Sequence, residues 1–137
     1  MSQTSDIQLL KPAGLVQSPA FSHVAVVPPG ATTILVGGQN AVTADGSLVG
    51  GDDPAAQTAQ VMTNLRVALE AAGATLDDLV SVTVLLAQGT DIAAAYGAAA
   101  AALPRTETPP LVTAAIVSAL GVPGALVEVS AVAAVTR

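Results

Sequence analysis

The sequence contains no cysteine and no tryptophan, and it has only one histidine, one tyrosine and one phenylalanine. Without cysteine the chain can form no disulfide, no thiolate metal ligand and no cysteine nucleophile. A single histidine, His23, cannot build a zinc site or a two-histidine relay, so we expect no metal and no cofactor. Any chemistry must therefore come from carboxylates, hydroxyls, amides and backbone groups.

Basic residues are also scarce. Ten acidic residues stand against four basic ones, which gives a formal net charge of −6. The basic residues are scattered along the chain and form no stripe that could neutralise phosphates: Lys11, Arg66, Arg105 and Arg137. Because binding of nucleic acid depends mainly on such a stripe, we expect no nucleic-acid partner.

Large side chains are few, although 52% of the 137 residues are hydrophobic. The length suits one domain spanning residues 1–137, and no repeat or linker divides it. The apolar residues are mostly alanine, valine and leucine, so the core of a single copy would be thin. This composition favours an oligomer that buries apolar surface between subunits.

A long apolar stretch covers residues 111–135, with Glu128 as its only charge. Gly121, Pro123 and Gly124 interrupt it, and both halves are rich in valine, so two buried strands joined by a turn are expected and no membrane span. The N-terminus, "MSQTSDIQLLKPAG", lacks a basic region followed by an apolar stretch. We therefore expect no secretory signal and a cytoplasmic protein.

Turn and cap residues divide the chain into expected elements. Residues 1–18 show no periodicity and predict an irregular arm. Two strand-like runs, 23–27 and 32–39, flank Pro28-Pro29-Gly30 and predict a hairpin. Asp53-Pro54 is typical of a helix start, and Gly73 of a helix end, so a helix over 54–72 is expected. We interpret Asp52-Asp53 as capping residues and Asp77-Asp78 as a turn.

The second half of the chain repeats this alternation of strand and helix. Period-two valines predict a strand over about 80–86. A helix capped by Thr90 or Asp91 then runs to Pro104. Two closing strands, at about 111–119 and 125–135, complete the order β-β-α-β-α-β-β. This order predicts an α+β fold in which two helices cover one face of the sheet.

Three segments together are similar to the Rid/YjgF family of reactive intermediate imine/enamine deaminases. They are "LVGGQNAVTADGSLVGGD", "QTAQVMTNLRVALEAAGATLDDLVSVTVLL" and "PGALVEVSAVA", and the likeness covers about residues 20–135. The resemblance implies a chorismate-mutase-like fold and a homotrimer with clefts between its subunits.

The resemblance also implies a site. In the family's deaminases an arginine clamps the substrate carboxylate, and a glutamate positions or activates water. Glu128, in "VEVSA", falls at the family's glutamate and is the candidate catalytic residue. The arginine is missing, because counting back from Pro123 puts Val112 at its position, next to Thr113, in "PPLVTAA". Valine cannot supply a bidentate grip on a carboxylate.

Other positions depart from the family pattern as well. Gly37 replaces a serine, Phe21 replaces a tyrosine, and Tyr96 falls where an asparagine is usual, whereas Gly38 and Gln39 persist. The candidate ligand-binding residues are therefore Phe21, Gly37, Gly38, Gln39, Tyr96, Val112 and Thr113.

For several of these residues the sequence also allows a second interpretation. Glu128 could instead be a carboxylate on an exposed strand face, and Tyr96 a ring at a helix surface. The Gly37-Gly38-Gln39 segment could simply need small residues for packing. His23 could act as a base, although a single histidine beside a strand is more often a surface residue or one satisfied by a hydrogen bond. Arg105 could replace the missing arginine, or could be a solvated charge in a polar loop.

We therefore expect a divergent Rid/YjgF-like protein that binds a small metabolite in trimer-interface clefts, with possible hydrolytic activity at Glu128. One alternative is an active imine/enamine deaminase in which another group replaces the arginine. A second alternative is a scaffold for protein interactions.

Overall fold

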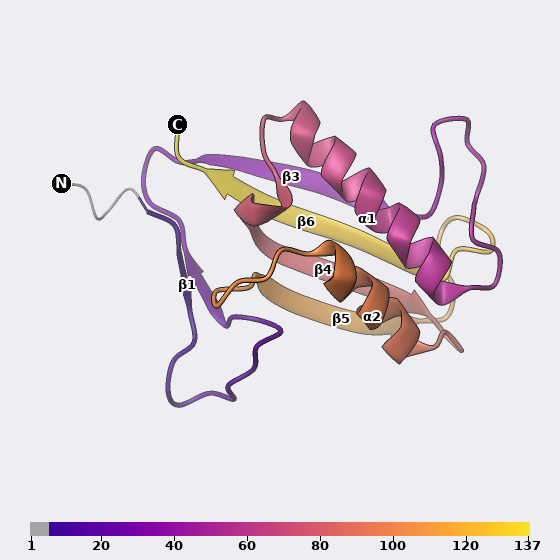
Figure 1. The fold of residues 1–137 in the computed structure, drawn as a ribbon, viewed down its shortest axis with the longest axis horizontal. Coiled ribbons are helices and arrows are strands. Elements are labelled where there is room, and N and C mark those ends of the chain that lie inside the picture. Colours follow the sequence, from indigo (N-terminus) through magenta and orange to yellow (C-terminus); the bar gives the residue numbers. More distant parts are fainter. Residues whose placement is uncertain (1–5) are drawn as a thin grey trace.

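The main sheet has four strands and is covered by two helices on one face. The computed structural model describes residues 6–137. The strands lie in the order β3 (Thr32–Gln39), β6 (Val127–Val135), β4 (Leu79–Ala87) and β5 (Leu111–Val117). Helices α1 (Pro54–Ala71) and α2 (Ile92–Ala102) lie on the same side of this sheet (Figure 1). The expected α+β class, with both helices on one face, is confirmed.

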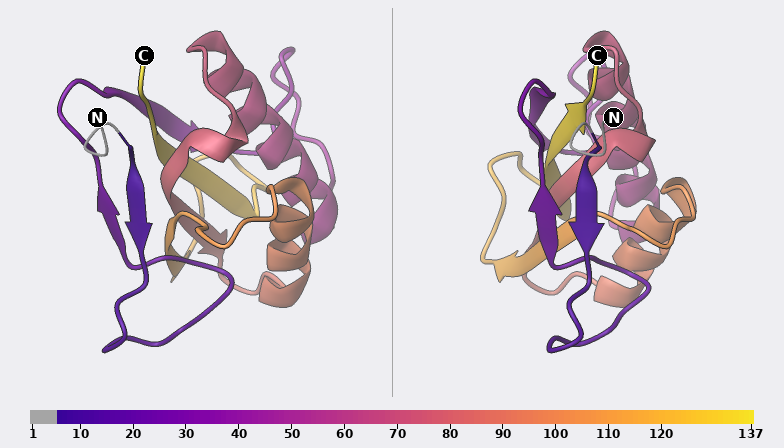
Figure 2. Two further views of the ribbon diagram at one scale, coloured as in Figure 1. Left: turned by 60° about the vertical axis from the view of Figure 1, so that its left-hand side comes forward. Right: turned by 90° about the vertical axis from the view of Figure 1, so that its left-hand side faces the viewer.

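The N-terminal arm departs from expectation. Residues Gln8–Leu10 form strand β1, which pairs antiparallel with β2 (Val24–Val26) in a separate two-stranded sheet. The prediction of an irregular arm is therefore wrong for these residues, and residues 1–5 lie outside the described part. The predicted hairpin of 23–27 with 32–39 is also wrong, because β2 pairs with β1 whereas β3 pairs with β6, in a different sheet. Figure 2 shows the β1–β2 pair beside one end of the main sheet.

The two closing strands are not neighbours. Strand β4 lies between them, antiparallel to β6 and parallel to β5. The expectation of two buried strands joined by a turn holds only for β6, because β5 is an edge strand whose central residues are exposed. Parallel pairing of β4 and β5 requires a crossover, which α2 provides. No helix within residues 6–137 is long and apolar enough to cross a membrane.

Helix α1 supplies several of the largest fully buried side chains of the core. The Asp53 carboxylate accepts hydrogen bonds from the N–H groups of Ala55 and Ala56, which confirms it as the N-cap. Val61, Leu65 and Leu69 recur at helical spacing and are fully buried against the sheet. The chain leaves the helix through Gly73 at φ +77°.

The two shorter helical segments begin at side-chain caps. Residues Leu76–Asp78 form a 3-10 helix, η2, closed by a capping box between Thr75 and Asp78. Asp91, rather than Thr90, caps α2 by accepting a hydrogen bond from the Ala94 N–H.

A buried glutamine joins α1 to the loop that leads into β6. The Gln57 side chain is completely buried. Its Nε2 donates to the carbonyl oxygens of Gly51 and Gly124, at 2.7 and 3.0 Å, and its Oε1 accepts from the Leu126 N–H at 2.8 Å. These three bonds satisfy backbone groups that would otherwise be unpaired in the interior. Gln57 therefore fixes the start of β6, and with it the position of Glu128.

Replacing Gln57 by alanine should destabilise the fold strongly. The Gln57→Ala variant removes a fully buried side chain and its three hydrogen bonds to the backbone, so we expect a loss of about 2–4 kcal/mol in the free energy of unfolding. Urea denaturation followed by circular dichroism measures this loss. The matched control is Gln88→Ala, since Gln88 is exposed and should change stability by less than about 0.5 kcal/mol. Equal effects of the two substitutions would contradict the bridging role.

Candidate functional site

The sheet register separates the candidate residues onto two faces. Residues paired directly across neighbouring strands point their side chains to the same face. Thr83 of β4 pairs with Ser130 of β6 and with Thr113 of β5. Leu85 pairs with Glu128. Glu128 and Thr113 therefore share the face that the helices leave uncovered.

Val112 lies on the other face. It pairs with Val82, which is buried beneath the helices. Of the two candidates, Thr113 and not Val112 is on the face of Glu128. Thr113 stands two strands from Glu128 and two residues along from Ala115, which lies directly across, so the separation is roughly 12 Å, a span that a long side chain can partly bridge.

Glu128 lies against the backbone of β3. Its carboxylate is half-buried, and a Cβ built on Gly38 would come within 2.6 Å of Glu128 Oε2. The pairing of β3 with β6 is irregular between Val36 and Gln39, so the strand bulges at the two glycines. Within residues 6–137 the carboxylate has no hydrogen-bond donor and no ion-pair partner. It is therefore free to accept a proton or a hydrogen bond from a bound molecule.

The neighbours of Gly38 are held by amide side chains. Gln39 folds back so that its Nε2 donates to the Gly37 carbonyl at 3.2 Å. Asn40 Nδ2 donates to the Val127 carbonyl, and Asn64 Nδ2 donates to the carbonyls of Asn40 and Val42. Sequence reasoning missed Asn40, Asn64 and Gln57, which hold the strand ends around Glu128. The available signal was Asn64, since asparagine in the interior of a helix is unfavourable unless its side chain bonds elsewhere, whereas glutamine is a good helix former and gave no signal.

The second group of candidates lines a cavity on the helix face. Phe21, Tyr96 and Val112 come together there, between α2 and the sheet, around a space of about 410 Å³. None of the residues that line it is charged. Tyr96 is 41% exposed and its hydroxyl bonds to no residue among 6–137. The structure thus brings together three of the candidates and keeps them on the opposite side of the sheet from Glu128.

His23 is not placed for catalysis. Its Nε2 is 2.7 Å from the carbonyl oxygen of Val16, and its ring meets the Phe21 ring edge to face. Both contacts lie in the N-terminal arm, away from Glu128. The interpretation of His23 as a residue satisfied by a hydrogen bond agrees with this geometry.

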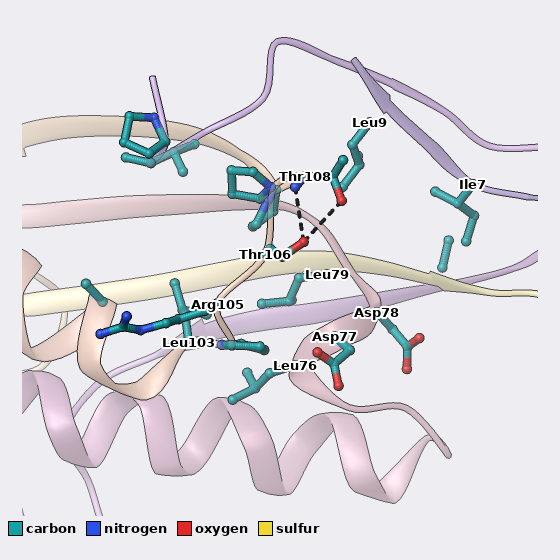
Figure 3. Close-up of a pocket in the computed structure, with 18 of the residues that line it drawn as sticks. Ile7, Leu9, Leu76, Asp77, Asp78, Leu79, Leu103, Arg105, Thr106 and Thr108 are labelled. Atoms are coloured by element: carbon teal, nitrogen blue, oxygen red, sulfur yellow. Dashed lines mark hydrogen bonds between the residues drawn. The ribbon is translucent and has the colours of Figure 1, made fainter. Parts of the chain in front are cut away.

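Arg105 lines an adjoining hollow of about 920 Å³ together with Asp77, Asp78 and Leu79. This hollow shares Ala20, Ala100, Leu103 and Val112 with the cavity under α2. Figure 3 shows the Arg105 guanidinium pointing away from both aspartates, and the one ion pair within residues 6–137 joins Arg66 to Glu70. Glu128 pairs with Leu85, six residues further along β4, or roughly 20 Å away. Arg105 therefore cannot act beside Glu128 of its own subunit.

No group of three or more histidine, cysteine or carboxylate side chains could hold a metal ion in the part of the chain from residue 6 onward. The chemistry available at Glu128 is accordingly that of one carboxylate, nearby hydroxyls and exposed strand backbone.

Comparison with known proteins identifies the family. The sequence profile of the family described as endoribonuclease L-PSP matches residues 15–135, almost the whole chain. The chain belongs to this family. A sequence search of curated proteins finds no match.

Solved structures of this L-PSP family, which includes the Rid proteins, resemble the chain over nearly their whole length. A Rid family protein of unknown function from Yersinia pestis, YyfB, is 30% identical, with a TM-score of 0.81 and coverage of 94% of this chain and 98% of that one. RidA from the Antarctic bacterium Psychrobacter sp. PAMC 21119 is 27% identical, with a TM-score of 0.67 and coverage of 98% and 100%. A YjgF/YER057c/UK114 family member from Mycobacterium tuberculosis is 26% identical, with a TM-score of 0.63 and coverage of 95% and 100%. The Rid/YjgF resemblance drawn from the sequence is confirmed.

A methyl group at position 38 should move the Glu128 carboxylate without unfolding the protein. In Gly38→Ala the new Cβ would overlap the end of a flexible side chain, so we expect a displaced carboxylate and a change in stability of less than about 1 kcal/mol. A crystal structure and a thermal unfolding curve measure the two effects. Gly37→Ala is the control, because nothing lies within 4 Å of a Cβ there. An unmoved carboxylate in Gly38→Ala would show that the contact does not constrain it.

Proposed function

We propose that this protein binds a small metabolite in clefts between the subunits of a homotrimer, and that Glu128 contacts the polar end of that metabolite. The observation that carries this proposal is the half-buried Glu128 carboxylate, which lies against Gly38 on the uncovered face without a partner among residues 6–137. A partly exposed carboxylate that no protein group occupies is available to accept a hydrogen bond from a bound ligand.

The uncovered face supports assembly. It carries Leu35, which is 76% exposed, together with half-buried Leu85, Val117 and Val132. Apolar residues clustered on a strand face normally pack against another layer. Helices cover only the opposite face, so further copies of the chain are the natural cover. The family resemblance favours three copies.

Assembly also explains the division of the candidate residues. Glu128 and the group formed by Phe21, Tyr96 and Val112 lie on opposite faces, so they cannot surround one ligand within a single subunit. They can do so when the uncovered face of one copy meets the edge formed by α2 and β5 of the next. We therefore place each cleft between two subunits, with Glu128 from one and Tyr96 from the other.

The ligand proposed for this cleft is not an amino-acid-derived imine with a free carboxylate. The Rid resemblance implies an arginine for such substrates, and neither Val112 nor Thr113 supplies a positive charge. RNA is a poor candidate as well, despite the family description, because four scattered cations on a chain of charge −6 give no phosphate-binding track. A relatively neutral metabolite fits the charge pattern better.

Trimer formation should depend on the uncovered face. We expect light scattering at micromolar concentration to give the mass of three chains. Leu35→Lys should shift the population toward monomer, because it puts a charge into the apolar contact. Val67→Lys, on the exposed side of α1 at 55% exposure, is the control and should leave the trimer intact. A monomer for the unmodified protein would overturn the assembly.

The absence of the family's substrate-binding arginine gives a direct test of whether the protein hydrolyses imines. The unmodified protein should hydrolyse 2-imino acids derived from serine or threonine very slowly or not at all. Thr113→Arg should raise the rate by roughly one to two decades, since a charge-assisted grip on the carboxylate contributes about 1.5–3 kcal/mol. Ammonia release from dehydratase-generated imines measures this.

Three further variants sharpen that result. Val112→Arg should also gain activity, because in the proposed cleft Val112 of one subunit faces Glu128 of the next. Thr63→Arg, on the exposed side of α1, is the control and should gain nothing. Glu128→Gln in the Thr113→Arg background should abolish the gain, since an amide cannot accept a proton from attacking water. Fast hydrolysis by the unmodified protein would instead favour an active imine/enamine deaminase in which another group replaces the arginine.

A further inference from the structure

The cavity under α2 is lined by more residues than Phe21, Tyr96 and Val112, and these further residues determine what it can bind. Its walls come from both helices, from the sheet and from the arm, and they include Thr58 and Met62 of α1. At about 410 Å³ it is within the range of small-molecule pockets and far larger than the space of one water. It opens beside Tyr96, which is 41% exposed.

The composition of α2 creates this space. Eight of its eleven residues are alanine, and Ala95, Ala99 and Ala100 face the cavity. Leucine or phenylalanine at such positions would fill the gap between helix and sheet, as the core usually requires. The short alanine side chains instead leave an unfilled apolar space between α2 and Val84, Val112 and Ala114 of the sheet.

One buried polar atom beside the cavity has no partner. Thr58 is among the lining residues and is 1% exposed, and its Oγ1 forms no hydrogen bond within the described residues. Threonine in a helix ordinarily bonds back to its own backbone, as Thr63 does with the Ala59 carbonyl at 3.1 Å. A buried hydroxyl left unpaired is unfavourable, so it marks a place where a bound molecule would supply the missing bond.

We propose that this cavity binds a neutral small molecule with an apolar body and one hydrogen-bonding oxygen, which Thr58 Oγ1 recognises. The absence of any charged side chain in the lining excludes a carboxylate or an ammonium group from the buried part. The inference rests on the proposed metabolite-binding function and specifies its ligand: the apolar part enters beneath α2, while the exposed end remains at the cleft.

Met62 gives a direct readout of occupancy. The sequence has two methionines, Met1 and Met62, and the second lines the cavity. Protein labelled with ¹³C at the methionine methyl groups therefore gives one reporter signal from the cavity and one from the N-terminal residue. Three probes share a ring and differ in one group: benzyl alcohol, toluene and benzoate.

We expect benzyl alcohol to shift the Met62 signal in a saturable way, with an affinity about three- to tenfold higher than that of toluene. Benzoate should leave the signal unchanged. Thr58→Val should lower the affinity for benzyl alcohol to that of toluene, and Thr58→Ser should retain the preference. In the free protein Thr58→Val should also raise the unfolding midpoint, because it removes an unpaired buried hydroxyl.

Filling the cavity is the second arm. Ala99→Leu should abolish the Met62 shift for every probe, whereas Ala101→Leu, on the exposed side of α2, should preserve it. An unresponsive Met62, binding of benzoate equal to that of benzyl alcohol, or full binding in Ala99→Leu would overturn the proposal. Failure of the proposed function is recognised separately, because it is measured by ammonia release and by the mass of the oligomer and not by the Met62 signal.

Discussion

Coverage of the sheet on one face alone is the constraint from which the rest of the structure follows. Both helices pack against the face that carries Val82, Val127 and Val129, so alternate residues along each strand enter two different environments. The covered face forms the core and lines a cavity that opens to solvent. The other face holds Glu128 among hydroxyls and apolar side chains that no helix within residues 6–137 covers. A single-residue step along β5 therefore moves a side chain from one environment to the other.

Small residues decide where space is left. Gly38 lets the Glu128 carboxylate lie directly on the β3 backbone, and the alanines of α2 hold a cavity open below the helix. A buried polar network keeps both spaces in place. Gln57 fixes the loop before β6, and Asn64 fixes the end of β3. Strand β6, which carries Glu128, and its neighbour β3 are therefore both anchored to α1. The side-chain amides of Gln57 and Asn64 form their hydrogen bonds with backbone groups, which makes the local geometry rigid.

Three features of the molecule's charge disfavour an anionic ligand. The position that the family resemblance assigns to an arginine carries no cation, the cavity lining is uncharged, and the chain is acidic overall. In the proposed function these features work together, because each disfavours an anionic ligand and none penalises a neutral one. Glu128 then serves as a hydrogen-bond acceptor or a base for a molecule held mainly by apolar contact.

The sequence by itself determined the family, the α+β class, the bounds of α1 and its Asp53 cap, since these depend on local periodicity and on residues close together in the chain. It also marked Glu128 as exceptional within an apolar run. Only the tertiary structure decided that β2 pairs with β1, that β4 separates β5 from β6, and that Thr113 rather than Val112 shares a face with Glu128. Strand pairing joins residues far apart in the sequence, and a shift of one residue reverses every side chain, so local patterns do not fix the register. The unpaired hydroxyl of Thr58 was hidden for the same reason, because the cavity beside it exists only once helix, sheet and arm are assembled.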